Sequence, residues 1–168
     1  MGTRCGDMDP AIVLHLMENK GLTLPQIKNI LNKKSGLLRL SGGKLSDLRD
    51  IIDAMEQGDD EARNALEVFC YRIKKYIEAY MAAMGRVDAV VFTAGIGENS
   101  PLFREKALGG LGHLRITVDP DRNQARSSET REISTPMSPV KVLVVPTREE
   151  REIAGQVMAV LSVGSAGA

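Results

Sequence analysis

The 168-residue sequence has no tryptophan, few cysteines or histidines, and no excess of either charge. Lysine plus arginine and aspartate plus glutamate both number 22, so no net field favours nucleic acid or an anionic membrane surface as a partner. The two cysteines, Cys5 and Cys70, lack CxxC spacing, and the two histidines, His15 and His113, stand apart from them. This pattern argues against a zinc site and favours two reduced thiols.

Long apolar segments are also missing. No run approaches the roughly 20 residues that a membrane span needs. The amino-terminal MGTRCGDMDP lacks the apolar stretch of a signal peptide. Hydrophobic residues still make up 43% of the chain, which is ample for a core in a chain of one-domain length. We therefore expect a cytoplasmic protein without nucleic-acid or membrane partners.

Helix signals dominate the first half of the sequence. Proline after aspartate marks a helix start, and threonine followed three residues later by glutamine is a capping-box pattern. The expected elements are a helix over 11–19 after Asp9-Pro10, a helix from Thr23 to about Lys33, a strand over 36–41, a helix capped by Ser46 and ended by Gly58, and a long helix from Asp59 or Asp60 to Gly85.

The long helix carries apolar residues at three- and four-residue steps, which predicts a stripe that faces the core or a partner rather than a cofactor. The stripe comprises Ala62, Leu66, Phe69, Ile73, Tyr76, Ile77, Tyr80 and Met84.

Strands and helices alternate in the second half, which favours a mostly parallel sheet covered by helices. The expected elements are a strand over 89–93, a helix over 101–108, a strand near 115–118, an irregular polar stretch over 119–139 with a solvated loop at 126–131, a strand over 141–145, a final helix after Thr147, and a flexible tail over 163–168.

The segment VDAVVFTAGIGENS, residues 87–100, is the most informative. Its apolar run suits a strand buried on both faces, and Ser100-Pro101 suits a helix start. The loop between them contains Gly95 and Gly97, and such a turn lets backbone approach a ligand at the carboxyl end of a sheet. A G-x-G turn alone is equally consistent with simple strand–helix packing.

Three further segments join this one in a recognisable order: GTRCGDMDP at 2–10, SDLRD at 46–50 after SGLLRLSG at 35–42, and VLVVPTREEREIA at 142–154. Together they resemble the C-terminal part of the acetate and propionate kinase family, over nearly the whole chain. The resemblance implies an incomplete actin-like, ribonuclease-H-like α/β domain with a mixed sheet covered by helices. It assigns residues 1–162 to the C-terminal nucleotide-binding lobe. Because family members are about twice as long, the chain is expected to be a fragment.

The resemblance also implies a reaction and site residues. Members transfer the γ-phosphoryl group of ATP to a carboxylate with Mg²⁺, giving acetyl phosphate and ADP. Arg4 matches the arginine that stabilises the phosphoryl group in transit, and a guanidinium fork suits phosphoryl oxygens. Its neighbour Cys5 stands where serine is usual.

The adenosine pocket is expected at two places. One is formed by Asp47, Leu48 and Arg49, where Asp47 can equally complement the dipole of a following helix. The other is the glycine turn, whose expected nucleotide-binding residues are Gly95, Ile96, Gly97 and Asn99.

Glu149 matches a metal-linked glutamate of the family, at the carboxyl end of a buried strand. Thr147 and Glu150 have capping-box spacing, which would leave Glu149 free for Mg²⁺. Arg148 replaces the usual asparagine, and its charge could pair with Glu149 and weaken metal binding.

Three interpretations remain open. The chain is part of an acetate kinase that is inactive alone, or a stand-alone nucleotide-binding or oligomerisation module, or an unrelated nucleotide-binding domain. The family's pocket for acetate or propionate has no counterpart in this sequence, so the two substrates are not distinguished. The family dimerises through this lobe, which predicts a homodimer.

Overall fold

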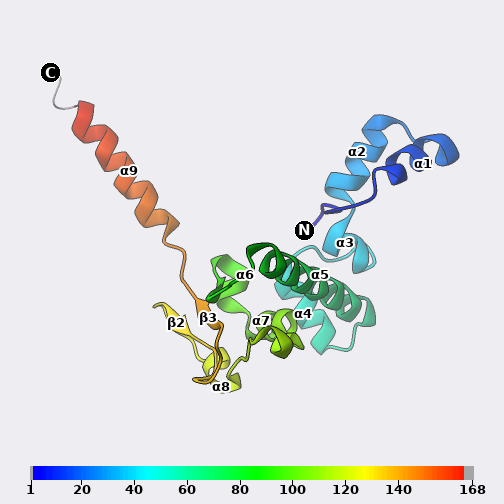
Figure 1. The fold of residues 1–168 in the computed structure, drawn as a ribbon. Helices are drawn as coiled ribbons and strands as arrows, with labels where there is room; N and C mark the ends of the chain where they lie inside the picture. The colour runs from blue at the N-terminus through cyan, green and yellow to red at the C-terminus, as the bar shows by residue number, and fades with distance from the viewer. Residues whose placement is uncertain (1, 165–168) are drawn as a thin grey trace. The chain divides into compact units, whose positions relative to one another are not determined.

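The computed structural model describes residues 2–164, which fall into two compact units divided between Tyr80 and Met81. The first is entirely helical and is called the helical unit below. The second combines helices with a small sheet and is called the α/β unit (Figure 1). Among the residues described, no helix combines the length and the apolar character needed to cross a membrane.

The helical unit is a series of helices joined by short turns. In chain order they are α1 (Ala11–Lys20), α2 (Leu24–Lys33), α3 (Gly36–Leu40), α4 (Leu48–Glu56) and the long α5 (Asp60–Met84), which extends past the boundary of the unit.

Local capping residues explain most of these boundaries. Asp9 Oδ1 accepts a hydrogen bond from the backbone N–H of Ala11 at 2.8 Å, and Gly21 ends α1 with a left-handed φ of 63°. The Gln26 side chain accepts from the backbone N–H of Thr23 at 2.8 Å, so the predicted capping box forms. These helix starts and the first stop are therefore confirmed.

Two local predictions in this unit are wrong. Residues 36–41 were expected to be a strand, but residues 36–40 form α3. Ser35 N–H and Leu38 N–H, at the start of this helix, donate to the carbonyls of Thr3 and Gly2. Helix α4 is capped by Asp47 rather than by Ser46. Three leucines in five residues fit either a short strand or a helical turn, so the pattern was ambiguous.

The core of the helical unit is built from small and branched side chains. The stripe predicted on α5 is buried at Ala62 and Leu66 but exposed at Tyr80 (61%) and Met84 (62%). The buried hydrophobic residues are Ile27, Leu37, Leu48, Ile51, Ala62, Ala65, Leu66 and Cys70.

The α/β unit combines three short strands with several helices. Its elements are β1 (Ala89–Phe92), α6 (Ala94–Asn99), α7 (Pro101–Leu108), a 3-10 turn (Leu111–Leu114), α8 (Pro120–Gln124), β2 (Arg131–Glu132), β3 (Lys141–Val144) and α9 (Glu149–Gly164).

Three expectations for this unit change. The glycine turn at 94–99 is a short helix rather than a loop. The strand expected near 115–118 is reduced to single bridges, from Ile116 to Val140 and from Val118 to Ser134. The stretch over 119–139 is not wholly irregular, because it contains α8 and β2.

The sheet has the order β1-β3-β2 and is mixed, since β1 and β3 are parallel while β2 and β3 are antiparallel. In register, Phe92 lies opposite Val144. Strand β1 is an edge strand here, and Val91 is 53% exposed. The prediction that this strand is buried on both faces is therefore wrong, because the side chain of Val91 is more than half exposed while that of Phe92, on the opposite face, is buried.

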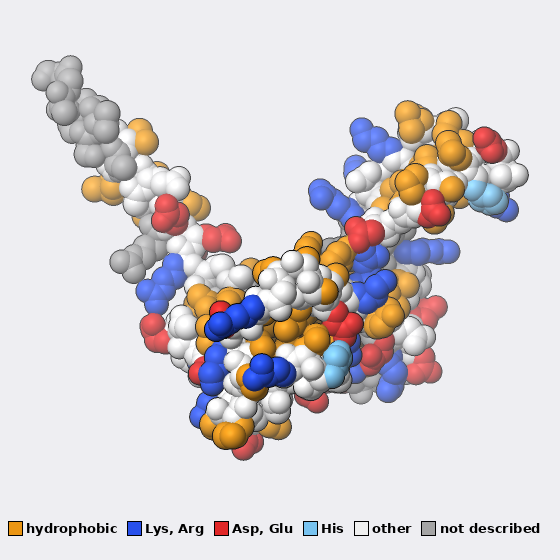
Figure 2. All heavy atoms as spheres, in the orientation of Figure 1, with side chains coloured by type: hydrophobic (Ala, Val, Ile, Leu, Met, Phe, Trp, Pro, Cys, Tyr) orange, Lys and Arg blue, Asp and Glu red, His pale blue; other side chains and the backbone are white. Residues whose placement is uncertain are grey.

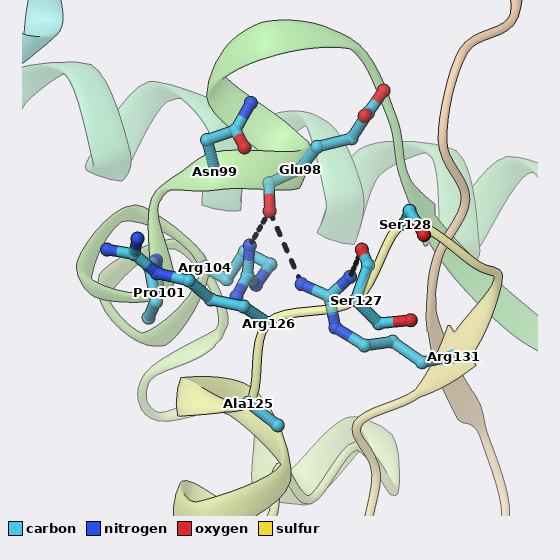
Figure 3. Close-up of a pocket in the computed structure, with 9 residues that line it drawn as sticks. All are labelled: Glu98, Asn99, Pro101, Arg104, Ala125, Arg126, Ser127, Ser128 and Arg131. Atoms are coloured by element: carbon cyan, nitrogen blue, oxygen red, sulfur yellow. Dashed lines mark hydrogen bonds between the residues drawn. The ribbon is translucent and has the colours of Figure 1, made fainter.

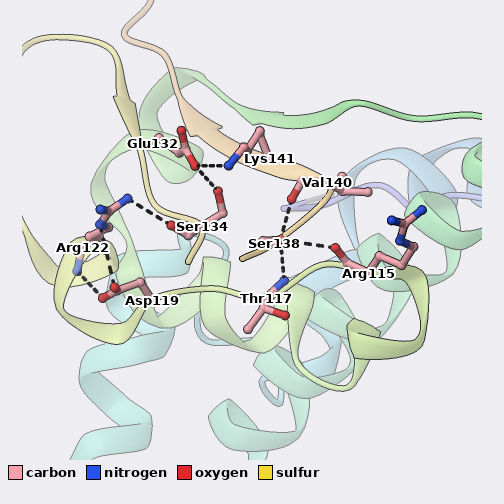
Figure 4. Close-up of polar contacts among 9 residues, drawn as sticks. All are labelled: Arg115, Thr117, Asp119, Arg122, Glu132, Ser134, Ser138, Val140 and Lys141. Carbon is pink, nitrogen blue, oxygen red and sulfur yellow. Dashed lines mark hydrogen bonds and ion pairs between the residues drawn. The ribbon is translucent and has the colours of Figure 1, made fainter. Parts of the chain in front are cut away.

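Apolar packing and a polar cluster hold this unit together. The rings of Phe92 and Phe103 meet edge to face with centroids 5.9 Å apart. The buried Ser138 hydroxyl accepts from Thr117 N–H at 3.1 Å and lies 2.7 Å from the carbonyl oxygen of Val140, so it joins two segments of chain (Figure 4). On the sheet, Glu132 pairs with Lys141 at 3.0 Å.

Helix α9 begins after Thr147, as predicted, and exposes apolar side chains (Figure 2). Ile153 is 61% exposed and Val160 72%. The predicted tail over 163–168 is only partly described: Val163 and Gly164 belong to α9, and residues 165–168 lie outside the described part of the chain.

Candidate functional site

The loops that follow β1 and β3 meet at one edge of the sheet. Because these strands are parallel neighbours, their carboxyl ends lie together, and Val145 N–H donates to the Phe92 carbonyl at 2.9 Å. A cavity of about 570 Å³ opens there. Gly95 and Glu149, predicted from separate segments, both line it, together with Ala94, Thr147, Arg148 and Glu150.

The two glycines of the turn have different surroundings. A Cβ added to Gly95 would meet nothing within 4 Å, so its backbone is open to the cavity. Gly97 is buried, and a Cβ there would lie 3.4 Å from Phe92. The structure thus separates a glycine that is open to the cavity from one that lies against Phe92. Ile96 is 41% exposed, and Asn99 Nδ2 donates to the Gly95 carbonyl at 2.9 Å.

Ala94 has a φ of 60°, in the left-handed region that costs a residue with a Cβ roughly 1–2 kcal/mol. It stands between β1 and Gly95 and lines the same cavity. Strained backbone of this kind is concentrated at ligand sites in proteins.

Glu98 joins the two loops. Its Oε1 accepts hydrogen bonds from both the backbone N–H and the hydroxyl of Thr147, each at 2.8 Å. These bonds, the backbone one foremost, lower the pKa of Glu98 below its ordinary value. The capping box predicted between Thr147 and Glu150 is replaced by these bonds to Glu98, in which both the backbone N–H and the hydroxyl of Thr147 donate. Glu98 was not predicted, because no local spacing signals a bond across 49 residues.

Glu149 is the first residue of α9, and its side chain is exposed at the cavity. Arg148 does not turn to it: the Arg148 Nη2 atom lies 3.0 Å from Glu129 Oε2. Within residues 2–164 no three His, Cys, Asp or Glu side chains are grouped as metal ligands. One or two carboxylates suffice for Mg²⁺ bound with nucleotide phosphates, so the residues present fit that ion.

The remaining predicted nucleotide residues lie in the helical unit. Asp47 caps α4 by accepting a hydrogen bond from the backbone N–H of Arg49 at 2.8 Å. Its carboxylate also accepts hydrogen bonds from Nε and Nη2 of the Arg49 side chain. The side-chain hydrogen bonds from Arg49 lower the pKa of Asp47 to about 2. The Leu48 side chain belongs to the core, at 3% exposure. Only its backbone is therefore available to a ligand.

Arg4 also belongs to the helical unit, on a segment whose backbone is fixed. Thr3 Oγ1 donates to the Asn32 carbonyl at 3.0 Å, and Cys5 N–H donates to the Leu31 carbonyl at 2.9 Å. The Arg4 side chain itself is exposed. Two bonded neighbours thus hold the backbone while the guanidinium stays accessible.

Comparison with known proteins decides the family. Residues 1–155 match the model of the acetokinase family. The chain belongs to the acetokinase family. Over 161 residues it is 53% identical to the acetate kinase of Oleidesulfovibrio alaskensis, covering 96% of this chain and 40% of that enzyme.

Solved structures extend the likeness to the fold. The crystal structure of Porphyromonas gingivalis acetate kinase matches with a TM-score of 0.86 at 46% identity, over 96% of this acetokinase chain and 40% of that one. A propionate kinase from Francisella tularensis matches with a TM-score of 0.80 at 37% identity, over 89% and 38%. The chain thus spans about 40% of these relatives and has part of their actin-like fold, a small mixed sheet with helices.

Proposed function

We propose that residues 1–162 are the C-terminal, nucleotide-binding lobe of an acetate kinase. The parent enzyme transfers a phosphoryl group reversibly from Mg-ATP to acetate, giving acetyl phosphate and ADP. The observation that carries this proposal is the convergence of Gly95 and Glu149 on one cavity at the carboxyl ends of two parallel strands. Open α/β sheets bind ligands at this edge.

The glycine turn offers the nucleotide a close backbone approach at Gly95, with Ile96 and Asn99 beside it. We assign Asp47–Arg49 to the adenosine pocket as well. The exposed Arg49 guanidinium, whose bond to Asp47 is on the surface, can exchange that partner for the base at low cost, since exposed ion pairs contribute about 0–1 kcal/mol.

Glu149 is the residue we assign to Mg²⁺, directly or through water. When bound, the ion screens the negative charge of the nucleotide phosphates during transfer. The chain's own contribution is to hold the Glu149 loop against the turn at Gly95, through the two bonds between Glu98 and Thr147. Arg148, bonded to Glu129, leaves the carboxylate unopposed by that cation.

Arg4 is assigned to the phosphoryl group in transit. Transfer requires no covalent protein intermediate, only alignment and charge stabilisation, and a guanidinium presents a fork of donors that matches phosphoryl oxygens. The exposed side chain on a fixed backbone suits that role. We assign the acetate pocket to the part of the relatives that this chain does not span, and we expect a homodimer in the cytoplasm.

Propionate is the second candidate acceptor, because a propionate kinase shares the fold at 37% identity over 89% of the chain. Acetate is favoured because the 53% identical relative is an acetate kinase. Both readings assign the same nucleotide residues.

The test is calorimetric titration of the purified chain with ADP, with and without Mg²⁺. We expect Glu149→Gln to abolish most of the gain in affinity that Mg²⁺ confers, while the matched control Glu152→Gln keeps it. Glu152 is a surface carboxylate of α9 that accepts from Gln156 at 3.0 Å. An unchanged Mg²⁺ dependence in the Glu149 variant would count against the metal assignment, and no ADP binding by the wild-type chain would count against the nucleotide site.

A further inference from the structure

A second cavity in the α/β unit is lined by arginines from three different elements. It measures about 590 Å³ and shares no lining residue with the cavity over Gly95. Arg104 comes from α7, Arg126 from the segment after α8, and Arg131 from β2 (Figure 3). Ser127 and Ser128 add neutral polar groups to the wall, which also includes Glu98 and Asn99, the latter assigned above to the nucleotide.

The inner two arginines bond to neutral oxygens. Arg104 is completely buried and donates to the carbonyls of Gly97, Glu98 and Asn123 and to Asn123 Oδ1, at 2.7–2.9 Å. Arg131 donates to the Glu98 carbonyl at 3.3 Å. Its Nε is buried and, within the described part of the chain, has no acceptor.

The carboxylates of the surrounding segments bond to other groups. The Glu98 carboxylate accepts from Thr147, and in Figure 3 it points away from the two inner guanidiniums while its carbonyl faces them. Glu129, in the loop that carries the cavity wall, pairs with Arg148 at 3.0 Å. The Glu98 carboxylate still interacts electrostatically with Arg131, so it offsets part, but not all, of the charge of the three arginines.

This arrangement destabilises the charged form of Arg104. Burial, and then the charge of Arg131, lower the pKa of Arg104 to about 10. Arg126 adds a third positive charge: its side chain is exposed and extends along the cavity towards Pro101 in Figure 3. An anion in the cavity would relieve the repulsion between these charges.

We propose that the cavity formed by Arg104, Arg126 and Arg131 binds the phosphate group of a small organic phosphate, at a site separate from the nucleotide cavity. Arg126 and Arg131 donate to the phosphate oxygens through their terminal nitrogens, each of which carries two hydrogens; those of Arg131 also donate to the carbonyls of Ser127 and Glu98, at 3.2 and 3.3 Å. Arg104 contributes charge from behind. The hydroxyls of Ser127 and Ser128 complete the set of neutral donors.

The experiment titrates the full chain with inorganic phosphate at constant ionic strength and follows the side-chain Nε–H resonances of the arginines by NMR. We expect the Arg126 and Arg131 signals to shift with one saturable curve, with and without ADP. Arg126→Gln should weaken phosphate binding about tenfold, the effect of losing one charged donor pair. The control Arg86→Gln, which removes an exposed guanidinium paired with Asp88, should leave the affinity unchanged.

Three results would overturn the proposal. The first is no shift of the Arg131 signal at about 10 mM phosphate, a concentration well above a millimolar dissociation constant. The second is an equal loss of phosphate affinity in the Arg126 and Arg86 variants, and the third is equal affinity for malonate, which would remove the assignment to phosphate. The readout is local to the arginine cavity. Failure of the chain to bind ADP would therefore leave this test intact.

Discussion

Replacing Arg104 with methionine should remove a large part of the stability of the α/β unit. The guanidinium is fully buried and makes four hydrogen bonds, to the carbonyls of Gly97, Glu98 and Asn123 and to the Asn123 side chain. At about 1.5–3 kcal/mol for each bond from a charged donor, these total roughly 6–12 kcal/mol. Burying the charge costs several kcal/mol, so we expect a net loss of about 3–5 kcal/mol.

The assay is hydrogen exchange followed by mass spectrometry, because the chain contains two units and a single unfolding transition cannot be assumed. Peptides covering α6, α7 and α8 should lose protection in the Arg104→Met protein, and those from the helical unit should change little. The control Arg86→Met alters an exposed side chain and should shift stability by about 0.5 kcal/mol or less. A loss below about 1 kcal/mol at Arg104 would show that the buried hydrogen bonds do not outweigh the cost of the buried charge.

Four further outcomes are expected. Hydrogen bonding lowers the folded-state pKa of Glu98, so the stability that the Glu98 carboxylate contributes is complete above the ordinary glutamate pKa of about 4.3 and is lost as pH falls through the lowered pKa. The melting temperatures of wild type and Glu98→Gln should therefore differ most at neutral pH and converge in acid. Gly95→Ala should fold normally but bind ADP more weakly, because its Cβ would enter the open cavity, whereas Gly97→Ala, whose Cβ would make only an ordinary 3.4 Å contact with Phe92, should keep the wild-type affinity; equal ADP affinities of the two variants would refute the distinction. The isolated chain should make no acetyl phosphate above background, since positioning the acceptor contributes up to about 7–11 kcal/mol, and Arg4→Ala in a full-length parent should lower kcat far more than nucleotide affinity. Light scattering at micromolar concentration should give the molar mass of a dimer or larger assembly, and a clean monomer would contradict this prediction. We expect the interface to include part of α5 or the edge of β1 and to bury at least about 1,000 Å².

The sequence alone was sufficient for the features that depend on neighbours three or four residues apart. Ser100 accepts from the Phe103 N–H at 3.2 Å, and Thr23 and Gln26 form their capping box, because a cap and its partner are encoded side by side. The strands at 89–93 and 141–145 were recognisable for a similar reason: an uninterrupted run of branched residues between turns leaves few alternatives.

Motif order likewise identified the family and predicted that Gly95 and Glu149 belong to one site. What the sequence could not supply is their shared cavity, which exists because β1 and β3 pair in parallel although the paired residues are 52 positions apart, Ala89 opposite Lys141. Pairing at that separation depends on which apolar faces can be buried together, and no local pattern records it.

Tertiary structure also decided where the polar side chains point. Thr147 bonds to Glu98 rather than to Glu150, and Arg104, which reads as an ordinary surface residue of a helix, is buried against Asn123. In both cases a nearby local partner or water competes with a group far along the chain. The distant group prevails because folding brings it within hydrogen-bond distance while excluding the water that would replace it.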